Sequence, residues 1–325
     1  MMGPGVKSIN LLYIGSRKFE KEIVSNLPKT WNLICVERLK EFRALGAEID
    51  IILDASIIDI INLDRDEFKK VKIIGCASTG TNHIKLSGSA SRNIKVYSLK
   101  ETPELLRSMS AAAEFSFLLL MALARNFVPA IDSVKNGEWD RLKIPGSILK
   151  GKTLGLIGFG RIGSAMATYA EIFGMTVVFY DPFLKLKPKK ILEHNSIEKL
   201  VAYSDFVSLH VPYTDELFKR PLINKEIFAS FKTGSYFINT SRGELIDEDA
   251  LITQLKSGKI KGAALDVLIN EPNIHENQIY KYAQESGANV ILTPHIAGYA
   301  VENVKIATLG MLDYLVRAGS EHPEL

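Results

Sequence analysis

The sequence predicts an α/β protein built from two doubly wound parallel sheets. Short runs of branched apolar residues recur with helical stretches between them, and this pattern stops after the first third of the chain and begins again past residue 150. Strands that are apolar throughout and alternate with helices are typical of parallel sheets covered on both faces. The 325 residues, 46% of them hydrophobic, also allow about two domains of roughly 150 residues each.

The expected strands fall into two series. The first covers residues 10–14, 33–36, 49–53 and 71–76, and the second covers 154–158, 176–180, 206–210, 235–239, 263–267 and 290–293. Between them, residues 101–152 hold an apolar helix and a stretch punctuated by glycine and proline, so a domain boundary is expected near its start or its end. Residues 301–318 have the periodicity of an amphipathic helix.

The longest apolar stretch, FSFLLLMALA at residues 115–124, is bounded by Glu114 and Arg125. It is about half as long as the roughly 20 residues needed to cross a bilayer, which favours a buried helix. Because the stretch is apolar on every side, it suggests more than one packing partner, such as its own sheet and another subunit. A central helix of one domain explains the composition equally well.

Charge and cysteine content exclude several classes of protein. The net charge of +3 is too small for the basic surface that nucleic-acid binding requires, and it favours a small solute as partner. Two cysteines, Cys35 and Cys76, cannot form a disulfide framework. The N-terminal residues lack the apolar core of a signal peptide, so a cytoplasmic protein is expected.

The segment TLGLIGFGRIGSAMATYA predicts a dinucleotide site. An apolar strand leads into Gly158, Gly160 and Gly163 and then into a helix. These glycines supply a tight turn, a close approach of the backbone to a pyrophosphate and tight helix packing, and the helix N-terminus offers free N–H groups to the phosphates. Arg161 and Ile162 lie within the same turn.

Asp181 ends the next expected strand, roughly 20 residues further on, where a carboxylate accepts hydrogen bonds from the adenosine ribose. A carboxylate there repels the additional phosphate of NADP, and the usual arginine is absent, so NAD is the expected cofactor. The basic segment 185–190, KLKPKK, could fold towards such a phosphate, although a solvated surface loop is the simpler interpretation.

Three polar residues follow expected strands in the second half of the chain: Arg242 in NTSRGELIDEDAL, Glu271 in ALDVLINEP and His295 in TPHIAG. Ligands of open α/β sheets bind beyond the carboxyl ends of the strands, so these side chains are candidates for one active site. Taken singly, they read as a surface ion pair, a turn residue and a structural histidine. Together with the upstream dinucleotide motif, they favour catalysis.

These motifs, with GFGRIG, YDP and SDFVSLHVP in the same order, make the sequence similar to the D-isomer-specific 2-hydroxyacid dehydrogenase family over nearly its whole length. The resemblance implies an NAD-dependent oxidoreductase that interconverts a 2-keto acid and its D-2-hydroxy acid. It implies that Arg242 binds the substrate carboxylate and carbonyl, that His295 is the general acid/base, and that Glu271 orients and charges His295.

The resemblance also implies contacts to the cofactor and the substrate. Asp266 would hold the nicotinamide carboxamide, and the substrate carboxylate would bind main-chain N–H groups of the loop from Ala77 to Gly80, namely those of Ser78, Thr79 and Gly80. Further cofactor contacts would come from His210, Val211, Pro212 and Thr240.

The resemblance further implies a discontinuous domain organisation. Residues 1–103 and 298–325 would form a flavodoxin-like substrate-binding domain, into which a Rossmann-type NAD domain, residues 104–297, is inserted, with a cleft between them. The apolar helix from Ser108 to Arg125 would lie at the interface of a homodimer formed through the NAD domain.

The chemistry of these residue types agrees with the implied roles. A 2-keto acid presents a planar carboxylate beside a carbonyl, which suits the rigid guanidinium fork of Arg242. Reduction places negative charge on the carbonyl oxygen, and a histidine titrates in the range needed to protonate it. A neighbouring glutamate favours the imidazolium form and keeps that acid available near neutral pH.

The remaining histidines, His83, His194, His275 and His322, lack comparable neighbours and are expected to be structural or exposed, although His83 directly follows the expected substrate loop. No spacing of cysteine, histidine and carboxylate residues predicts a metal site.

Some features depart from the family pattern. The segment from Pro103 to Glu114 is about two residues longer than usual, the segment beginning at Thr214 is also longer, and Lys85 stands where an acid is common. The first two segments flank the cleft or the cofactor groove, so the substrate could be an unusual one. The sequence does not identify the side chain of the substrate. The loop GCASTGTNH resembles the phosphoglycerate dehydrogenase branch, but a regulatory C-terminal domain is not expected.

Two alternatives remain. A non-enzymatic NAD-sensing binding protein could have the same fold, and a formate or phosphite dehydrogenase could combine the fold with a different substrate. Arg242, Glu271 and His295 argue against the first alternative, and turnover of any 2-keto acid would exclude it.

Overall fold

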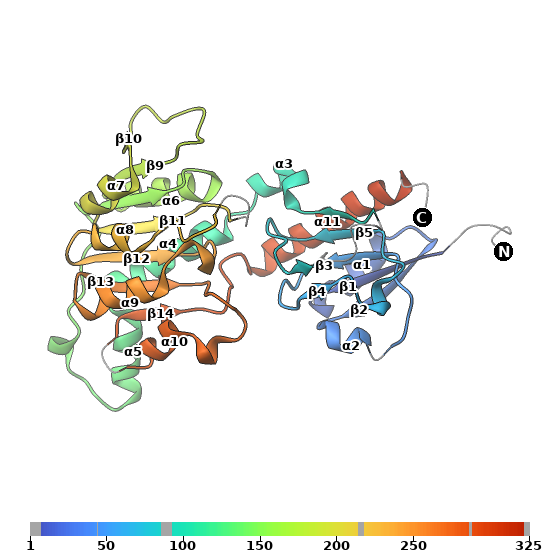
Figure 1. Cartoon of the computed structure of the whole chain (residues 1–325), viewed down its shortest axis with the longest axis horizontal. Coiled ribbons are helices and arrows are strands. Elements are labelled where there is room, and N and C mark those ends of the chain that lie inside the picture. Colours follow the sequence, from blue (N-terminus) through green and yellow to red (C-terminus); the bar gives the residue numbers. More distant parts are fainter. Residues whose placement is uncertain (1–7, 44, 86–92, 214–217, 286–287, 322–325) are drawn as a thin grey trace. The chain divides into compact units, whose positions relative to one another are not determined.

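The computed structural model describes residues 8–43, 45–85, 93–213, 218–285 and 288–321 (Figure 1). The start of the longer segment at Thr214 and His322 lie outside these residues. The chain forms two compact units: unit 1 comprises Met1–Met109 and Ala300–Leu325, and unit 2 comprises Ser110–Tyr299. Unit 1 is therefore discontinuous, and the chain crosses between the units a few residues after each of the expected boundaries.

Unit 1 contains a five-stranded parallel sheet in the order β2-β1-β3-β5-β7 and a two-stranded sheet of β4 and β6. Its strands are β1 (Ile9–Ile14), β2 (Trp31–Val36), β3 (Ile51–Asp54), β4 (Ile61–Asn62), β5 (Ile73–Cys76), β6 (Ile84–Lys85) and β7 (Lys95–Tyr97). Its α-helices are α1 (Glu20–Asn26), α2 (Leu39–Arg43), α3 (Pro103–Arg107) and α11 (Val301–Ser320).

The alternation of side chains along the unit 1 strands produces two cores. In β1, Leu11 and Tyr13 face the cluster that includes residues of α1 and α11, whereas Leu12 and Ile14 face the cluster that includes residues of α2. Successive strand residues point to opposite faces of a sheet, so a strand that is apolar at every position is covered on both sides. The C-terminal helix α11 thereby becomes part of the core of the N-terminal unit.

Unit 2 contains a seven-stranded parallel sheet in the order β10-β9-β8-β11-β12-β13-β14. Its strands are β8 (Thr153–Ile157), β9 (Thr176–Tyr180), β10 (Leu192–Glu193), β11 (Phe206–Leu209), β12 (Ser235–Asn239), β13 (Ile260–Leu265) and β14 (Val290–Leu292). Its α-helices are α4 (Ala111–Ala124), α5 (Phe127–Lys135), α6 (Arg161–Ile172), α7 (Ile197–Tyr203), α8 (Lys225–Ala229), α9 (Glu248–Lys256) and α10 (Gln278–Ala283).

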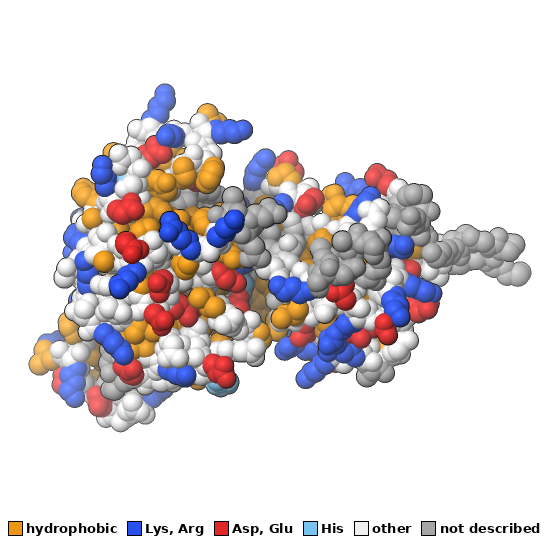
Figure 2. Space-filling view, viewed as in Figure 1, with side chains coloured by type: hydrophobic (Ala, Val, Ile, Leu, Met, Phe, Trp, Pro, Cys, Tyr) orange, Lys and Arg blue, Asp and Glu red, His pale blue; other side chains and the backbone are white. Residues whose placement is uncertain are grey.

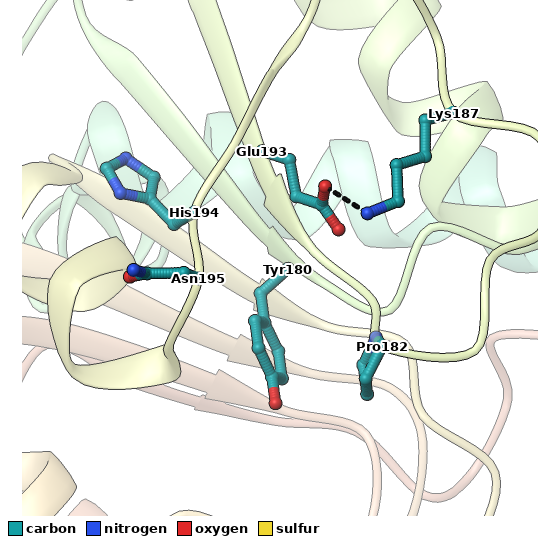
Figure 3. Close-up of a pocket in the computed structure, with 6 residues that line it drawn as sticks. All are labelled: Tyr180, Pro182, Lys187, Glu193, His194 and Asn195. Atoms are coloured by element: carbon teal, nitrogen blue, oxygen red, sulfur yellow. Dashed lines mark hydrogen bonds and ion pairs between the residues drawn. The ribbon is translucent and has the colours of Figure 1, made fainter.

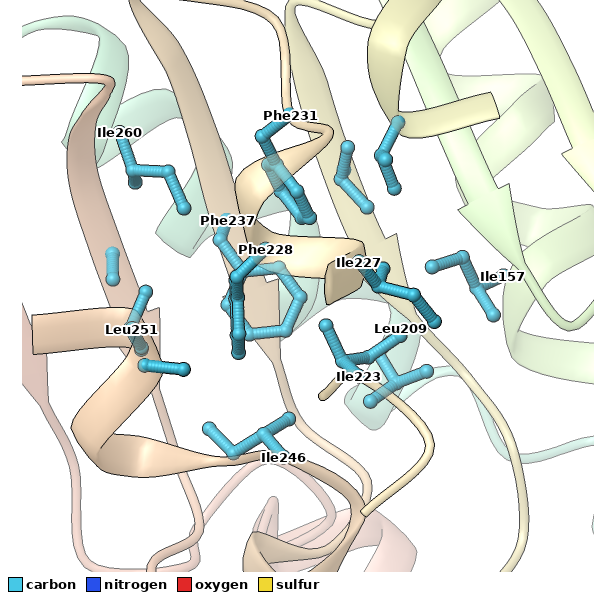
Figure 4. Packing of buried hydrophobic residues seen from close by; sticks show 14 of the residues in the cluster. Ile157, Leu209, Ile223, Ile227, Phe228, Phe231, Phe237, Ile246, Leu251 and Ile260 are labelled. Carbon is cyan, nitrogen blue, oxygen red and sulfur yellow. The ribbon is translucent and has the colours of Figure 1, made fainter. Parts of the chain in front are cut away.

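The seven-stranded sheet also separates two cores. Phe237 of β12 packs with Phe228 and Phe231 on the face covered by α7 to α10 (Figure 4). Its neighbours Tyr236 and Ile238 face the opposite side, where α4 and α6 lie. The order of the strands from β10 to β13 is the Rossmann order, so the predicted α/β class with two doubly wound sheets is confirmed.

All ten expected strands are present, and the structure adds β4, β6, β7 and β10. Each added strand has two or three residues; β7 and β10 lie at sheet edges, and β4 and β6 pair only with each other. Strands this short contain too little of the apolar pattern to be detected in the sequence. The closing helix α11 begins at Val301, as expected, and continues to Ser320.

The apolar stretch that ends at Ala124 is long enough and apolar enough, when counted from Pro103, to cross a membrane. In the structure it is two helices, α3 in unit 1 and α4 in unit 2. Phe117, Leu120 and Leu123 of α4 are buried in the unit 2 core, whereas Leu118 and Met121 remain exposed. Helix α4 is therefore a core helix with one exposed apolar strip.

Candidate active site

The carboxyl ends of the strands of unit 2 carry the predicted site residues as one row. From β9 to β14 in spatial order, these ends carry Asp181, the turn Gly158–Gly163, residues 210–212, Thr240 and Arg242, Asp266 and Glu271, and His295. Parallel strands all end at the same edge of their sheet, so residues far apart in sequence are brought onto that edge.

The turn between β8 and α6 needs glycine at two of its three glycine positions, 158 and 163. Gly158 has a φ of +90°, and a Cβ atom there would collide with the carbonyl oxygen of His210. A Cβ atom on Gly163 would collide with the carbonyl oxygen of Gly158, whereas Gly160 faces open space. The backbone at Gly160 is thus accessible at the start of α6, where a helix offers unpaired N–H groups to an anion. This cradle fits a pyrophosphate.

Two further residues of the turn belong to α6. Arg161 is its first residue, and burial lowers the pKa of its guanidinium. Ile162 packs against the core beneath the helix.

Asp181 follows β9 and ties the glycine turn to that strand. Its Oδ2 accepts a hydrogen bond from the N–H of Phe159 at 2.9 Å, and its Oδ1 accepts one from the N–H of Phe183 at 3.0 Å. Each carboxylate oxygen retains a second lone pair that a ribose hydroxyl can use.

A pocket of about 290 Å³ adjoins the end of β9 (Figure 3). Its lining comprises Tyr180, Pro182, Lys187, Glu193, His194 and Asn195. The Nε2 atom of His194 is buried without a hydrogen-bond partner in the described part of the chain, and the ring packs against Tyr203. Lys187 is paired with Glu193 at 2.6 Å.

Residues 210–212 follow β11 at the centre of the row. Burial lowers the pKa of His210 to about 3, so the ring is neutral, and its Nε2 lies 2.9 Å from the hydroxyl of Ser208. Val211 packs against the core and Pro212 is exposed. Thr240, directly after the neighbouring strand β12, shares a 2.7 Å hydrogen bond with Ser116 of α4.

His295 and Glu271 form a close pair. The Nδ1 atom of His295 lies 2.6 Å from Oε1 of Glu271, and the two side chains are 29% and 35% exposed. The contact leaves Nε2 of His295 available to a ligand. His295 also has a φ of 54°, an uncommon backbone conformation for a residue other than glycine. Residues held in this way are often found at functional sites.

Asp266 holds the segment that carries His295. Its carboxylate accepts hydrogen bonds from the hydroxyl of Thr293 at 2.6 Å and from the N–H groups of Ile296 and Ala297 at 2.9 and 2.8 Å. Burial raises the pKa of Asp266, and these hydrogen bonds and the charge of His295 act in the opposite direction. Three of its four acceptor positions are therefore occupied, which leaves one, on Oδ2, for a ligand.

Arg242 is held through its backbone. Asn239, which is buried at the end of β12, accepts a hydrogen bond from the N–H of Ser241 and donates one to the carbonyl oxygen of Arg242, both at 2.9 Å. Burial lowers the pKa of the guanidinium, and the charge of Glu271 opposes that shift. Arginine remains charged, so the site combines a fixed cation with a carboxylate–histidine pair.

Three residues that were not predicted to belong to the site, Gly243, Glu248 and Asn277, hold its loops in place. The buried carboxylate of Glu248 accepts hydrogen bonds from the N–H of Ile269 at 2.9 Å and from the amide of Asn277 at 2.6 Å, and burial raises its pKa. A Cβ atom on Gly243 would collide with the backbone of Leu268. These contacts fix the segment leading to Glu271 against the segment that carries Arg242. In the sequence, Glu248 reads only as an acidic residue in the first turn of a helix.

Ser78, Thr79 and Gly80 belong to unit 1, where they follow β5. The N–H of Ala77 donates to the carbonyl oxygen of Asp54 at 2.8 Å, and the hydroxyl of Ser78 donates to the carbonyl oxygen of Gly80 at 2.7 Å. No described residue accepts a hydrogen bond from the N–H groups of Ser78, Thr79 or Gly80. Three consecutive free N–H groups suit a carboxylate ligand.

Within the described residues, no group of three or more histidine, cysteine, aspartate or glutamate side chains is arranged to hold a metal ion. On the face shown in Figure 2, basic and acidic side chains are interspersed. The arrangement at the sheet edge instead combines an anion cradle, a cation and a proton-carrying pair.

Known proteins are similar to this chain in sequence and in fold. Residues 117–297, which lie within unit 2, match the model of the NAD binding domain of D-isomer specific 2-hydroxyacid dehydrogenases. The chain is 37% identical over 264 residues to a hydroxypyruvate reductase of Thermotoga maritima, with 81% of this chain and 82% of that protein covered. It is 38% identical over 248 residues to a D-3-phosphoglycerate dehydrogenase of Methanocaldococcus jannaschii, with 74% of this chain but only 44% of that protein covered.

A solved structure is similar over both units. The D-lactate dehydrogenase of Aquifex aeolicus in complex with NAD and lactic acid aligns with a TM-score of 0.76 at 27% identity, covering 96% of this chain and 95% of that one.

Proposed function

The chain belongs to the D-isomer specific 2-hydroxyacid dehydrogenase family, and on this premise we propose which of its residues carry the NAD-dependent reduction of a 2-keto acid. The observation that carries the proposal is the 2.6 Å contact between His295 and Glu271, on the sheet edge that also presents Arg242 and the glycine turn. When bound, NADH supplies the hydride that reaches the keto carbon.

Arg242 binds the substrate. Its planar guanidinium donates two parallel hydrogen bonds, one to the carboxylate and one to the carbonyl oxygen of a 2-keto acid. The charge also polarises the carbonyl and stabilises the negative charge that develops on its oxygen. The half-buried position supports this role, because a charge-assisted hydrogen bond is stronger where water is partly excluded.

His295 transfers the proton. With Nδ1 directed at Glu271, the imidazolium holds its second proton on Nε2 and donates it to the carbonyl oxygen during reduction. In the oxidation direction, neutral His295 accepts the hydroxyl proton at the same atom. Glu271 favours the charged ring and fixes its orientation, and Asp266 acts as a positioning residue for the segment that carries the histidine.

The cofactor site extends along the rest of the row. The N–H groups at the start of α6, including those of Arg161 and Ile162, bind the pyrophosphate at the open backbone of Gly160. Asp181 accepts hydrogen bonds from the adenosine ribose, and the free acceptor of Asp266 meets the nicotinamide carboxamide. Residues 210–212 and Thr240 line the groove between these ends.

NADH is the preferred cofactor. A 2′-phosphate beside the Asp181 carboxylate is repelled, at a cost of a few kcal/mol or on the order of 10²-fold in affinity. Within the basic segment 185–190, Lys187 is already paired with Glu193, which supports a surface role for that lysine (Figure 3).

Unit 1 is proposed to bind the substrate carboxylate through the N–H groups of Ser78, Thr79 and Gly80. Their lack of partners among the described residues supports this role.

A homodimer through unit 2 is proposed from the apolar residues that remain exposed on consecutive elements. Leu118 of α4, Phe127 and Val134 of α5, and Trp139 and Leu142 beyond α5 are all exposed, Trp139 by 91%. An apolar surface of this kind marks an interaction site. Sedimentation analysis at micromolar concentration is expected to give twice the mass of the chain, and a monomer would contradict the proposal.

Free Cys35 and Cys76 support a cytoplasmic location.

The test is a panel of 2-keto acids, including phosphorylated ones, assayed with NADH and with NADPH. We expect turnover of at least one keto acid, with NADH strongly preferred. Binding of NADH without turnover of any keto acid would instead favour the non-enzymatic alternative. Equal or faster turnover with NADPH would refute the role of Asp181 and direct attention to residues 185–190.

A further inference from the structure

The five-stranded sheet of unit 1 has its own switch point. In its sheet the chain moves from β1 to β2 on one side and then returns to β3 on the other side, so the direction of winding switches between β1 and β3. Ligands of doubly wound sheets bind beyond the carboxyl ends of the strands at this switch point. Asp54 is the last residue of β3, and the loop from Ala77 to Gly80 follows the adjacent strand β5.

At this edge, Asp54 and His83 form a second carboxylate–histidine pair. Oδ2 of Asp54 lies 2.7 Å from Nε2 of His83, and Oδ1 accepts hydrogen bonds from the N–H of Ser56 at 3.1 Å and its hydroxyl at 2.9 Å. Asp54 is 1% exposed, so its charge has no contact with solvent, while the His83 side chain is 14% exposed. The pair resembles that of Glu271 and His295, yet it plays no part in the mechanism above.

The orientation of the His83 ring leaves one nitrogen unused. Asp54 engages Nε2, and Nδ1 has no hydrogen-bond partner in the described part of the chain. Fixing one nitrogen by a carboxylate fixes the direction of the other. The pair therefore presents a single, oriented polar atom at the edge of unit 1.

The neighbouring backbone is held in an uncommon conformation. Ile57 has a φ of 50°, which is an outlier for a β-branched residue. Its N–H lies 3.4 Å from Oδ1 of Asp54. Such conformations persist where the surrounding structure holds them, and they concentrate at ligand-binding sites. Asp54 thus fixes both the His83 ring and this segment.

The loop proposed to bind the substrate carboxylate lies next to the pair. The N–H of Ala77 donates to the backbone of Asp54, and Gly80 is only three residues from His83, which limits the distance between their Cα atoms to about 11 Å. The turn closed by the hydrogen bond from Ile84 N–H to Thr81 O, at 2.9 Å, shortens that span. The loop from Ala77 to Gly80 and the Asp54–His83 pair are therefore neighbours at the same edge of unit 1.

We propose that the Asp54–His83 pair binds a hydroxyl group on the third carbon of the substrate, so that the preferred substrates are 3-hydroxylated 2-keto acids. This inference rests on the proposed function, in which residues 78–80 bind the carboxylate. A hydroxyl both donates and accepts, so it satisfies Nδ1 whether the ring is neutral or charged. An alkyl group cannot form a hydrogen bond with Nδ1 in either state of the ring, and an anionic group is repelled by the carboxylate of Asp54.

The expected selectivity follows from the cost of an unpaired polar group. A site that hydrogen-bonds a substrate hydroxyl discriminates strongly against the analogue that lacks it, because the polar atom of the protein is then desolvated without a partner. One hydrogen bond to a charged or partly charged group corresponds to about 10- to 100-fold in kcat/KM.

Hydroxypyruvate and pyruvate test the proposal, because they differ by one oxygen atom on the third carbon. With NADH, the unmodified enzyme is expected to prefer hydroxypyruvate by at least about 10-fold in kcat/KM. His83→Phe keeps a ring but removes both nitrogens, so it is expected to lose most of this preference, because the hydroxyl of hydroxypyruvate loses its partner and pyruvate no longer leaves Nδ1 unpaired. Asp54→Asn releases the ring and is expected to reduce the preference in the same direction.

Asp59→Asn is the matched control. Asp59 lies on the same segment as Asp54, but its carboxylate binds Arg38 and the N–H of Leu39. This variant is expected to keep the preference for hydroxypyruvate. Because these variants lie in unit 1, circular dichroism and thermal unfolding report whether each of them is folded, and His83→Gln replaces His83→Phe if the latter does not fold.

The possible results distinguish a failure of the proposed function from a failure of the role proposed for the Asp54–His83 pair. If no 2-keto acid is reduced, the proposed function fails. If keto acids are reduced but hydroxypyruvate is not preferred, or if a folded His83 variant keeps the full preference, the role of the Asp54–His83 pair is refuted and the proposed function stands.

Discussion

Replacing Glu271 by glutamine removes the charge that faces His295 while keeping the size of the side chain. The two groups are 2.6 Å apart at their nearest atoms and each side chain is about one-third exposed. For charge centres about 4 Å apart, the Coulomb energy is about 1 kcal/mol in water and about 4 kcal/mol at an effective dielectric constant of 20. Since the pair is partly solvated, the attraction lost in the variant lies between these two values.

The expected result is a displaced pH profile. Reduction of a keto acid needs the imidazolium form of His295, so the alkaline limb of kcat/KM should move to lower pH in Glu271→Gln. Oxidation needs the neutral ring, so its acidic limb should move in the same direction. The assay is absorbance of NADH at 340 nm across pH 5 to 10, in both directions, with a solvent isotope effect to establish that chemistry limits the rate.

Asp249→Asn provides the control, because Asp249 is exposed on α9. It alters the net charge by the same amount and is expected to leave both profiles in place. Profiles of Glu271→Gln that superimpose on those of the parent enzyme, at rates limited by chemistry, would refute the pairing of Glu271 with His295.

Three further changes are expected to have distinct effects. Arg242→Lys should keep NADH affinity but lose most of kcat/KM, because an ammonium group cannot donate the two parallel hydrogen bonds of a guanidinium; steady-state turnover like that of the parent would exclude Arg242 as the substrate-binding cation. Glu248→Gln should lower kcat about 10-fold, with unchanged NADH affinity and a pH profile displaced towards that of the Glu271 variant, because it weakens the contacts to Ile269 and Asn277; an unchanged profile would assign Glu248 a purely structural role. His210 has its pKa lowered by burial to about 3, so the unfolded chain binds a proton that the folded protein does not between about pH 6.5 and 3. Stability should therefore fall with decreasing pH across that range by on the order of 1 kcal/mol per unit, and urea unfolding of His210→Gln should show a smaller dependence between pH 6.5 and 5.

The sequence predicted the sheets better than their edges. Strands such as β1 and β12 are apolar at nearly every position and were expected within a few residues of their observed bounds. The short strands β7 and β10 were missed because pairing with a neighbour, rather than their own composition, makes them strands. The discontinuity of unit 1 came from the family resemblance, since α11 has no local signal that assigns it to the N-terminal unit.

In the candidate site, the residues that belong to a local motif could likewise be predicted, and those placed by the tertiary fold could not. Gly158, Gly160 and Asp181 could be selected from the sequence, because the spacing of a strand, a turn and an acid reflects the local needs of a dinucleotide. The residues that hold the segment before Glu271 could not, because Glu248 reaches Ile269 only through the tertiary fold. The Asp54–His83 pair could not be predicted either. Asp54 ends β3 and His83 follows the loop after β5, and no sequence motif links the two residues.

The central claim is that His295 transfers the proton, and the most direct measurement compares His295→Gln with the parent enzyme. Glutamine keeps a hydrogen-bonding side chain but does not titrate, so kcat for reduction of the best keto acid should fall by about 10²- to 10⁴-fold. The affinity for NADH, measured by fluorescence titration in the absence of keto acid, should be unchanged. A variant that reduces keto acids at the rate of the parent with the same NADH affinity would contradict the assignment of His295 and, with it, the mechanism built on its contact with Glu271.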